Sequence, residues 1–161
     1  MPPGTDLGGA DGSTTALAGS GDPPIEQRIE NVMGAWRHAI LNKDADTVVS
    51  VDRTFAAERE AFMTPLITSA ETDSEERVRA FSTRVLGKFQ AARCAEVFGR
   101  LLKDKSEHVR GNAAWGLGEL ANKPDGRESA RKALPTLRRI EKQDPSAEAR
   151  DAAATAVKKL K

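Results

Sequence analysis

Aspartate and arginine recur six residues apart at three places in the sequence, as Asp73 and Arg79, Asp104 and Arg110, and Asp144 and Arg150. A carboxylate beside a guanidinium can bind an anion or take part in proton transfer. Recurrence at the same place in three similar segments instead favours a structural role. Each arginine then pairs with its own aspartate or with the aspartate of the neighbouring segment. The sequence therefore predicts a ladder of ion pairs and not a catalytic row.

Residues that perform catalysis in other proteins are few here. The chain has one cysteine, Cys94, and two histidines, His38 and His108, which are 70 residues apart. A single cysteine excludes an internal disulfide and a cysteine-based zinc site. The sequence contains no phosphate-binding loop, no nucleophile elbow and no cluster with metal-ligand spacing. We therefore expect no catalytic residue, no metal and no cofactor, and a protein that is not an enzyme.

A set of basic side chains is a candidate for anion binding. Arg127, Arg131, Arg138 and Lys142 stand at i, i+4, i+11 and i+15, which is one face of a helix. No aromatic or glycine-rich element accompanies these charges. The spacing predicts a solvated face or a surface for an acidic partner, with nucleic acid as the alternative ligand.

These residues belong to an internal repeat. The segments that begin at Asp73, Asp104 and Asp144 follow one another at offsets of 31 and 40 residues and continue into similar runs, AFSTRVLGKF, GNAAWGLGEL and DAAATAVKKL. Self-similarity at this spacing is typical of a solenoid of helical hairpins. Each hairpin consists of a helix A, a tight turn that contains the aspartate, and a helix B. The nine additional residues before the third segment predict a longer loop over 121–128.

The two helices of each hairpin have different features. The turn aspartate is expected to accept N–H bonds at the start of helix B. Small residues on the buried stripe of helix B, such as Ala113 and Gly116, indicate that neighbouring hairpins approach closely. Pro65 and Pro135 are expected to kink helix A of the first and third hairpins.

The pattern Asp-x(4)-Val-Arg-x-x-Ala-Ala-x-(Ala/Gly)-Leu-Gly, with a proline in helix A, resembles the HEAT repeat. The form is the short bacterial one that is also seen in phycobilisome-lyase-like proteins. Residues 104–120 match best, and the resemblance covers about 54–161. It implies an all-α fold, a right-handed α-solenoid of about three HEAT-like helical hairpins with an N-terminal helical cap. It implies little about chemistry, because HEAT-like arrays serve mostly as scaffolds and adaptors.

Composition indicates where the parts of the chain begin and end. Residues 1–22 are rich in Gly, Ser, Thr, Pro, Ala and Asp and predict a disordered tail. Apolar residues at helical spacing predict a helix over about 24–42, within an N-terminal helical cap over 23–53. The repeat array is expected over 54–161, with hairpins over about 54–90, 91–121 and 128–161, the first of them starting with a helix over about 54–70. Only 4% of residues are aromatic, so the core is expected to consist mostly of Ala, Leu and Val.

Charge is distributed unevenly along the chain. Residues 1–76 carry five basic and fourteen acidic side chains, whereas residues 77–161 carry twenty and ten. Opposite halves can attract each other within one molecule or between copies, so self-association stays open. No apolar run approaches the ~20 residues of a membrane span, and the start of the chain lacks the features of a signal peptide. We expect a cytoplasmic protein that does not bind membranes.

Helix B lines the concave side of such arrays, so its positions outside the core are the candidates for partner binding. Trp115 stands in a row whose other members, such as Arg84, are polar. Aromatic and arginine side chains supply much of the binding energy at interfaces. The predicted partner-binding residues are Arg77, Phe81, Arg84, Lys88, His108, Asn112, Trp115 and Glu119. The alternative is that Trp115 lies flat over its alanine-rich neighbours and only packs.

The sequence thus predicts a non-catalytic protein–protein interaction scaffold or adaptor that binds another protein on the concave helix-B surface. The alternative is the binding of nucleic acid or an acidic partner through the basic C-terminal half. A third hypothesis, an enzyme or a lyase-like cofactor handler, comes only from the lyase-associated members of the family. It ranks last, because neither an apolar pocket nor an acid–base pair can be recognised in the sequence.

Overall fold

The computed structural model describes residues 21–161, which fold into helices without any strand. The predicted tail over 1–22 lies almost entirely outside the described residues. The described part contains nine α-helices and two short 3-10 segments. In chain order they are α2 (Ile25–Leu41), α3 (Ala45–Ala57), α4 (Arg59–Thr72), α5 (Glu76–Phe89), η1 (Ala92–Cys94), α6 (Ala95–Leu101), α7 (Glu107–Glu119), η2 (Leu120–Asn122), α8 (Pro124–Arg131), α9 (Leu134–Gln143) and α10 (Ala147–Leu160).

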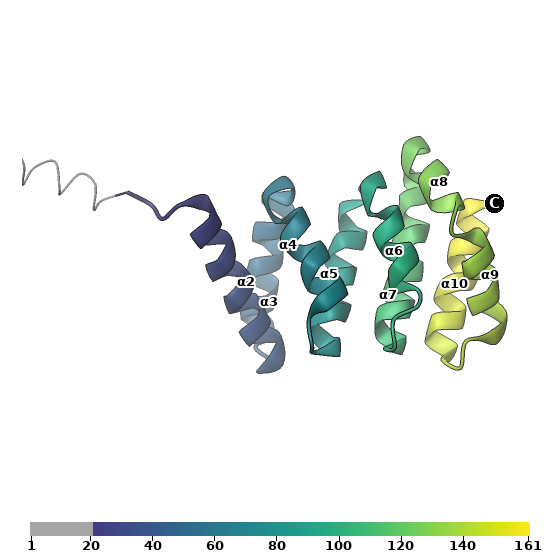
Figure 1. Cartoon of the computed structure of the whole chain (residues 1–161), viewed down its shortest axis with the longest axis horizontal. Helices are drawn as coiled ribbons and strands as arrows, with labels where there is room; N and C mark the ends of the chain where they lie inside the picture. The colour runs from purple at the N-terminus through teal and green to yellow at the C-terminus, as the bar shows by residue number, and fades with distance from the viewer. Residues whose placement is uncertain (1–20) are drawn as a thin grey trace, which may run out of the picture.

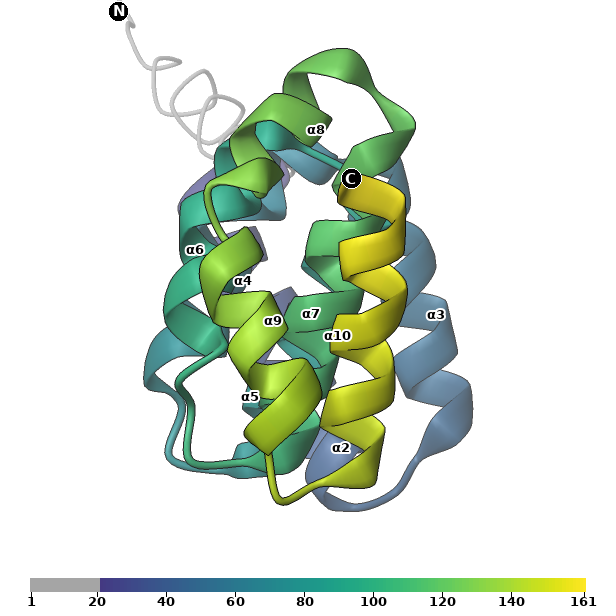
Figure 2. The same cartoon turned by 90° about the vertical axis from the view of Figure 1, so that its right-hand side faces the viewer.

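The helices follow one another along one axis and form an α-solenoid (Figure 1). Seen along that axis, they lie in two layers (Figure 2). One layer holds α2, α4, α6 and α9, which are the A helices of their hairpins. The other layer holds the B helices α5, α7 and α10, and α7 packs between the other two. α3 lies on the same side at the N-terminal end. The predicted all-α solenoid is therefore confirmed.

The turn aspartates begin the B helices in the same way in all three hairpins. Each carboxylate accepts a hydrogen bond from the backbone N–H two residues later, at 2.9 Å for Asp73, 2.8 Å for Asp104 and 2.9 Å for Asp144. This local bond turns the chain and satisfies a donor that the first turn of a helix leaves without a partner. The start of each B helix is therefore determined by local sequence.

One hydrophobic core runs through the whole array, from Trp36 in α2 to Leu160 in α10. Its C-terminal part consists of small residues that let the B helices approach closely. At Gly118 of α7, an added Cβ would lie 3.3 Å from the Cα of Ala156 in α10. Its N-terminal part is aromatic, because the rings of Trp36 and Phe62 each lie 5.0 Å from the ring of Phe55.

Several helix bounds differ from the predicted ones. The helix expected over 54–70 begins only at Arg59, because α3 continues to Ala57. α8 begins inside the loop expected over 121–128, where Pro124 can start a helix because a first-turn residue needs no N–H donor. Gly126 lets this helix pack, since a Cβ there would lie 2.5 Å from the carbonyl oxygen of Leu120.

The two helix-A prolines also behave differently from each other. Pro65 lies inside α4, which runs unbroken over 14 residues. Pro135 lies in the first turn of α9, so helix A of the third hairpin is divided into α8 and α9. The expected kink at Pro135 is therefore wrong, because this proline begins a helix instead of bending one.

Candidate partner-binding face

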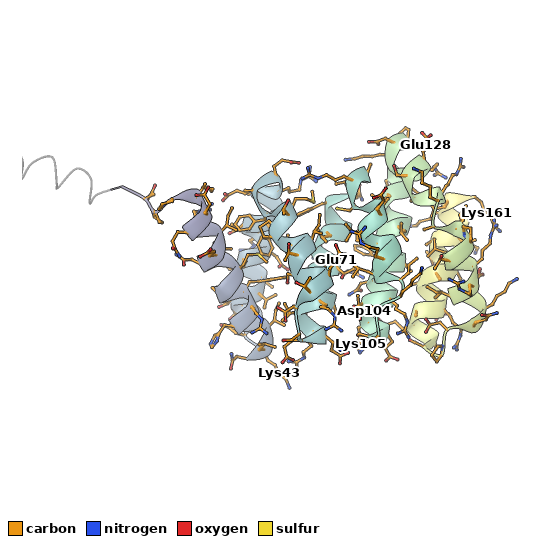
Figure 3. All side chains as sticks on the ribbon, in the orientation of Figure 1. Lys43, Glu71, Asp104, Lys105, Glu128 and Lys161 are labelled. Carbon is orange, nitrogen blue, oxygen red and sulfur yellow. The ribbon has the colours of Figure 1, made fainter. Side chains whose placement is uncertain are left out.

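The Asp–Arg ladder joins neighbouring hairpins. Arg79 binds Asp104 through two N–H···O bonds of 3.1 Å, and Arg110 binds Asp144 at 2.8 and 2.9 Å. The same guanidiniums return to the carbonyl oxygens of their own turns, at 3.0 Å in both cases. Of the two pairings left open by the sequence, the one with the following hairpin is formed. The Asp104 carboxylate lies in the α6–α7 turn (Figure 3).

Burial of these pairs shows that they serve the fold. The side chains of Arg79 and Asp104 are only 5% and 11% exposed. The hydrogen bonds from Arg110 hold the pKa of Asp144 below its ordinary value. Partial burial raises the pKa of Asp73, but hydrogen bonds from Arg37 and from the Glu75 N–H outweigh this effect and leave it lowered. Ionised, hydrogen-bonded carboxylates of this kind do not bind a further anion.

The centre of the predicted surface is a stack of two side chains from neighbouring B helices. The guanidinium of Arg84 on α5 lies 3.7 Å from the ring centroid of Trp115 on α7. The ring lies against Gly87, where an added Cβ would be 2.4 Å from its Cζ3 atom. Trp115 is partly exposed and Arg84 is exposed. The ring therefore rests on a glycine and under an arginine, with part of its surface open to solvent.

Other predicted partner-binding residues already have contacts within the chain. The side-chain amide of Asn112 donates to the carbonyl oxygen of Ala80 at 2.9 Å. The carboxylate of Glu119 accepts from Gln90 and from Lys159, each at 3.2 Å. His108 Nδ1 lies 3.5 Å from a carboxylate oxygen of Glu148. These three residues connect α5, α7 and α10, whereas Arg77, Phe81 and Lys88 are exposed along α5.

A groove lies beside this surface, between α3 and α5. Two cavities of about 440 and 540 Å³ share Val49 and Asp52 of α3, and both are lined by α5 on the other side. A third cavity of about 350 Å³, between α5 and α7, shares Arg77 and Phe81 with the first. The first cavity thus shares two lining residues with each of the other two. We call the first two cavities together the α3–α5 groove.

The groove exposes apolar side chains. Val49 and Phe81 are 50% and 41% exposed, and within residues 21–161 the only other large apolar side chain of this kind is Ile25. The two line the same cavity from α3 and from α5. The sequence pattern predicts Phe81 as a partner-binding residue but not Val49, which belongs to the predicted N-terminal cap. The sequence carries only a weak signal for this exposure, because adjacent positions such as Val48 and Val49 can both face the core, as Ala39 and Ile40 do.

A partly buried carboxylate lies in the groove. Asp52 accepts a hydrogen bond from Trp36 Nε1 at 3.1 Å. Burial raises the pKa of Asp52, while the Trp36 bond and the positive charge of Lys88 oppose the rise. Burial also raises the pKa of the Cys94 thiol, to about 11. Cys94, however, lies in the core beside Met63 and not in the groove. Asp52 is thus the one carboxylate of the groove lining, and the sequence pattern did not predict it as a site residue.

The basic set of the third hairpin does not lie on one helix. Arg127 and Arg131 are on α8, and Arg138 and Lys142 are on α9. Arg127 donates to the carbonyl oxygens of Lys159 and Ala121, at 2.6 and 3.2 Å. Arg131 donates to those of Leu160 and Lys161, at 2.9 and 3.3 Å. The expected single basic face is therefore wrong, because the helix breaks between Arg131 and Leu134 and two of the arginines bind the C-terminal carbonyls of α10.

The repeats and the two-layer solenoid define the class of protein. The family model described as HEAT repeats matches residues 63–158, so the chain belongs to the HEAT-repeat family. A similar solved structure is the complex of CpcE and CpcF of phycocyanin lyase from Nostoc sp. PCC7120, at 26% identity and a TM-score of 0.67. The match covers 82% of this chain and 77% of that one. No curated protein matches the chain.

This likeness corrects one prediction. The expectation that the protein is not an enzyme is contradicted, because the similar structure is a complex of a lyase, which is an enzyme. The sequence showed no pocket, since the residues that line the α3–α5 groove come from segments that meet only in the folded chain. Within residues 21–161, no helix is both long and apolar enough to cross a membrane.

Proposed function

We propose that this chain is a protein-binding subunit that holds a partner protein on the exposed side of α5 and α7, with Arg84 and Trp115 at the centre. HEAT repeats generally bind other proteins, and the similar solved structure is itself a complex of two proteins. The observation that carries the proposal is the Arg84–Trp115 stack, with 3.7 Å between guanidinium and ring centroid. A fixed ring under an arginine loses little side-chain entropy on binding, as at interface hot spots.

Affinity capture from a lysate of the source cells tests this proposal. The wild-type chain is compared with Arg84→Glu, which reverses the charge but keeps the ring, and with an Arg84→Ala, Trp115→Ala double variant. Arg139→Glu is the matched control, because Arg139 is an exposed arginine on α9 outside the predicted binding sets. We expect both Arg84 variants to lose the captured protein while circular dichroism stays helical. Equal capture by wild type and variants would overturn the proposal.

A second candidate function is suggested by the likeness to the phycocyanin lyase complex. We infer that the chain acts as one member of a two-chain lyase whose substrate is a protein. The α3–α5 groove supports this candidate, because it combines apolar walls with the partly buried carboxylate of Asp52. The test adds the purified chain and any HEAT-repeat protein captured with it to phycocyanin and follows its visible absorption. Capture of no second HEAT-repeat chain, with unchanged absorption, would remove this candidate.

A further inference from the structure

The α3–α5 groove is strongly basic, although α3 belongs to the acidic half of the sequence. Five basic side chains line its two cavities, namely Lys43, Arg53, Arg59, Arg77 and Lys88. The lining contains one carboxylate, that of Asp52, whose pKa burial raises. Within residues 21–161, the nine ion pairs of the structure use none of these five cations. Their charge is therefore available to a ligand.

The positions of these cations follow both edges of the groove. Lys43 and Arg53 stand on the α2–α3 side, and Arg77 and Lys88 on the α5 side. Lys43 lies just after α2, at the end of the array away from α10 (Figure 3). At the end of the groove away from Lys43, Arg59 donates to the carbonyl oxygen of Phe89 at 3.0 Å, which holds the Arg59 side chain in place. A ligand in the groove thus meets positive charge on two sides.

The middle of the groove is apolar. Val49 and Phe81 are among the most exposed large apolar side chains of the described residues, and both line the same cavity. Val85 and Phe89 of α5 continue the apolar lining toward Arg59. Burying Val49 and Phe81 under a ligand stabilises the complex by the hydrophobic effect, whereas Val85 and Phe89 are already buried in the free chain. A phosphate backbone has no apolar stripe to place there, so the lining favours a peptide over a nucleic acid.

The shape of the groove suits a helix. It lies along α3 and α5, which have 13 and 14 residues, so each is about 20 Å long. The neighbouring B helices leave less room. The cavity between α5 and α7 is about 350 Å³, because the Trp115 ring lies against Gly87, and Gly118 brings α10 against α7. A partner helix laid between two helices buries residues at i, i+3 or i+4, and i+7 along one side.

We propose that the α3–α5 groove binds an acidic amphipathic helix of the partner protein. Its apolar side covers Val49 and Phe81, and its carboxylates on both flanks bind the cations at the two edges. The inference deepens the proposed function, on which it rests for the existence of a protein partner. It adds α3, the groove and the chemical class of the bound segment.

Synthetic helices of about 14 residues test the inference with the purified full chain. Three fluorescent peptides share one leucine stripe at i, i+4, i+7 and i+11 and differ only in their flanking residues, which are Glu, Gln or Lys. Fluorescence anisotropy at low salt is expected to give the affinity order Glu, then Gln, then Lys. Equal affinities, the reverse order, no binding of the Glu peptide, or equal binding of a Glu peptide with a scrambled stripe would each overturn the inference.

Variants of the chain place the peptide in the groove. Val49→Glu puts a carboxylate in the groove at an exposed position of α3, and Arg77→Glu reverses the charge of one edge. Each substitution is expected to weaken binding of the Glu peptide by about tenfold or more, because like charges then face each other. Thr155→Glu and Arg139→Glu are matched controls at exposed positions of α10 and α9 and should leave binding unchanged. Circular dichroism confirms that each variant is folded.

The same reagents separate this inference from the proposed function. A single-stranded oligonucleotide that binds as tightly as the Glu peptide and is lost in Val49→Glu would overturn the inference in favour of a nucleic acid. If lysate capture depends on Arg84 and Trp115 but survives Val49→Glu, the groove inference fails while the proposed function stands. If the Arg84 and the Val49 variants both capture the partner normally, the groove inference and the proposed function both fail.

Discussion

Gly87 shows how one small residue places a candidate binding side chain. Without a Cβ at this position, the Trp115 ring lies against the backbone of α5 and comes under the guanidinium of Arg84. A glycine inside a helix costs about 0.5–1 kcal/mol relative to alanine. Here that cost is offset by contact with a large aromatic ring.

We predict that Gly87→Ala lowers the free energy of unfolding, because the added Cβ would lie 2.4 Å and 2.8 Å from two ring atoms of Trp115. The ring must move, and the Arg84 stack with it. Urea denaturation followed by tryptophan fluorescence measures both effects. Gly34→Ala is the matched control, since no atom lies within 4 Å of its added Cβ. That variant should gain about 0.5–1 kcal/mol. Equal effects of the two substitutions would show that Gly87 makes no room for Trp115.

Asp52 and Asp144 are predicted to affect stability in opposite directions at neutral pH. Burial raises the pKa of Asp52, so the ionisation of Asp52 destabilises the fold. Hydrogen bonds from Arg110 lower the pKa of Asp144, so the ionisation of Asp144 stabilises the fold. Asp52→Asn should therefore raise the melting temperature at pH 7, since asparagine still accepts the Trp36 bond. Asp144→Asn should lower it.

Acidification supplies the control for this pair of variants. The stabilisation from Asp144 is present above its ordinary pKa of 3.8 and is lost as the pH falls through its lower folded pKa. The destabilisation from Asp52 begins to decrease as the pH falls through its raised folded pKa and is gone below its ordinary pKa of 3.8. Both differences from wild type should shrink toward low pH. A decrease in melting temperature for Asp52→Asn at pH 7 would contradict the assignment.

At the scale of elements, the ladder of aspartates and arginines sets the spacing of the hairpins. Each rung joins the first turns of one B helix to the turn that begins the next. At the C-terminal end the pattern stops, because within residues 21–161 Arg150 donates only to the carbonyl oxygen of Asp144. The N-terminal rung is also different, since Arg37 comes from α2, an A helix, to bind Asp73.

We predict that Arg79→Met costs about 3–5 kcal/mol of unfolding free energy, because it leaves the nearly buried carboxylate of Asp104 without its partner. Arg93→Met is the comparison, since the Arg93–Glu60 pair is 54% and 84% exposed. Exposed pairs contribute about 0–1 kcal/mol. Chemical denaturation of both variants distinguishes the two kinds of pair. A loss below about 1 kcal/mol for Arg79→Met would show that the ladder contributes little.

At the scale of the whole molecule, the helices are held unequally. α7 has B-helix neighbours on both sides, and seven of its 13 residues are buried. α3 has two buried residues, Val48 and Phe55, among the same number. α3, which lines the α3–α5 groove, is therefore held less firmly by the rest of the array than α7 is.

Hydrogen exchange is expected to follow this order. Amides of α7 should exchange slowest and those of α3 markedly faster, because protection follows the burial and contacts of each element. Mass spectrometry of peptic fragments measures this, and α10 is the internal comparison because one of its sides has no further B helix. If the groove binds a partner helix, the Glu-flanked peptide should slow exchange in α3 more than in α10. Equal exchange of α3 and α7 in the free chain would contradict the unequal packing.

Much of the architecture was predictable because its causes are local or periodic. The offsets of 31 and 40 residues predicted the hairpins, and the turn aspartates predicted where the B helices begin. The Arg84 and Trp115 row was also recognisable, since equivalent positions of a repeat face the same way. The break at Pro135 was not, because a proline in a helical pattern can bend one helix or begin another.

The sequence by itself determined the all-α repeat architecture, the family and the residues available on each B helix. Only the tertiary structure decided which of them lie together. The α3–α5 groove joins Val49 and Asp52 to Phe81 and Lys88, and its basic lining includes Lys43 and Arg53 from an acidic half of the chain. The physical reason is that periodicity specifies the face of a helix, whereas the distance between two helices depends on side-chain packing across segments distant in sequence.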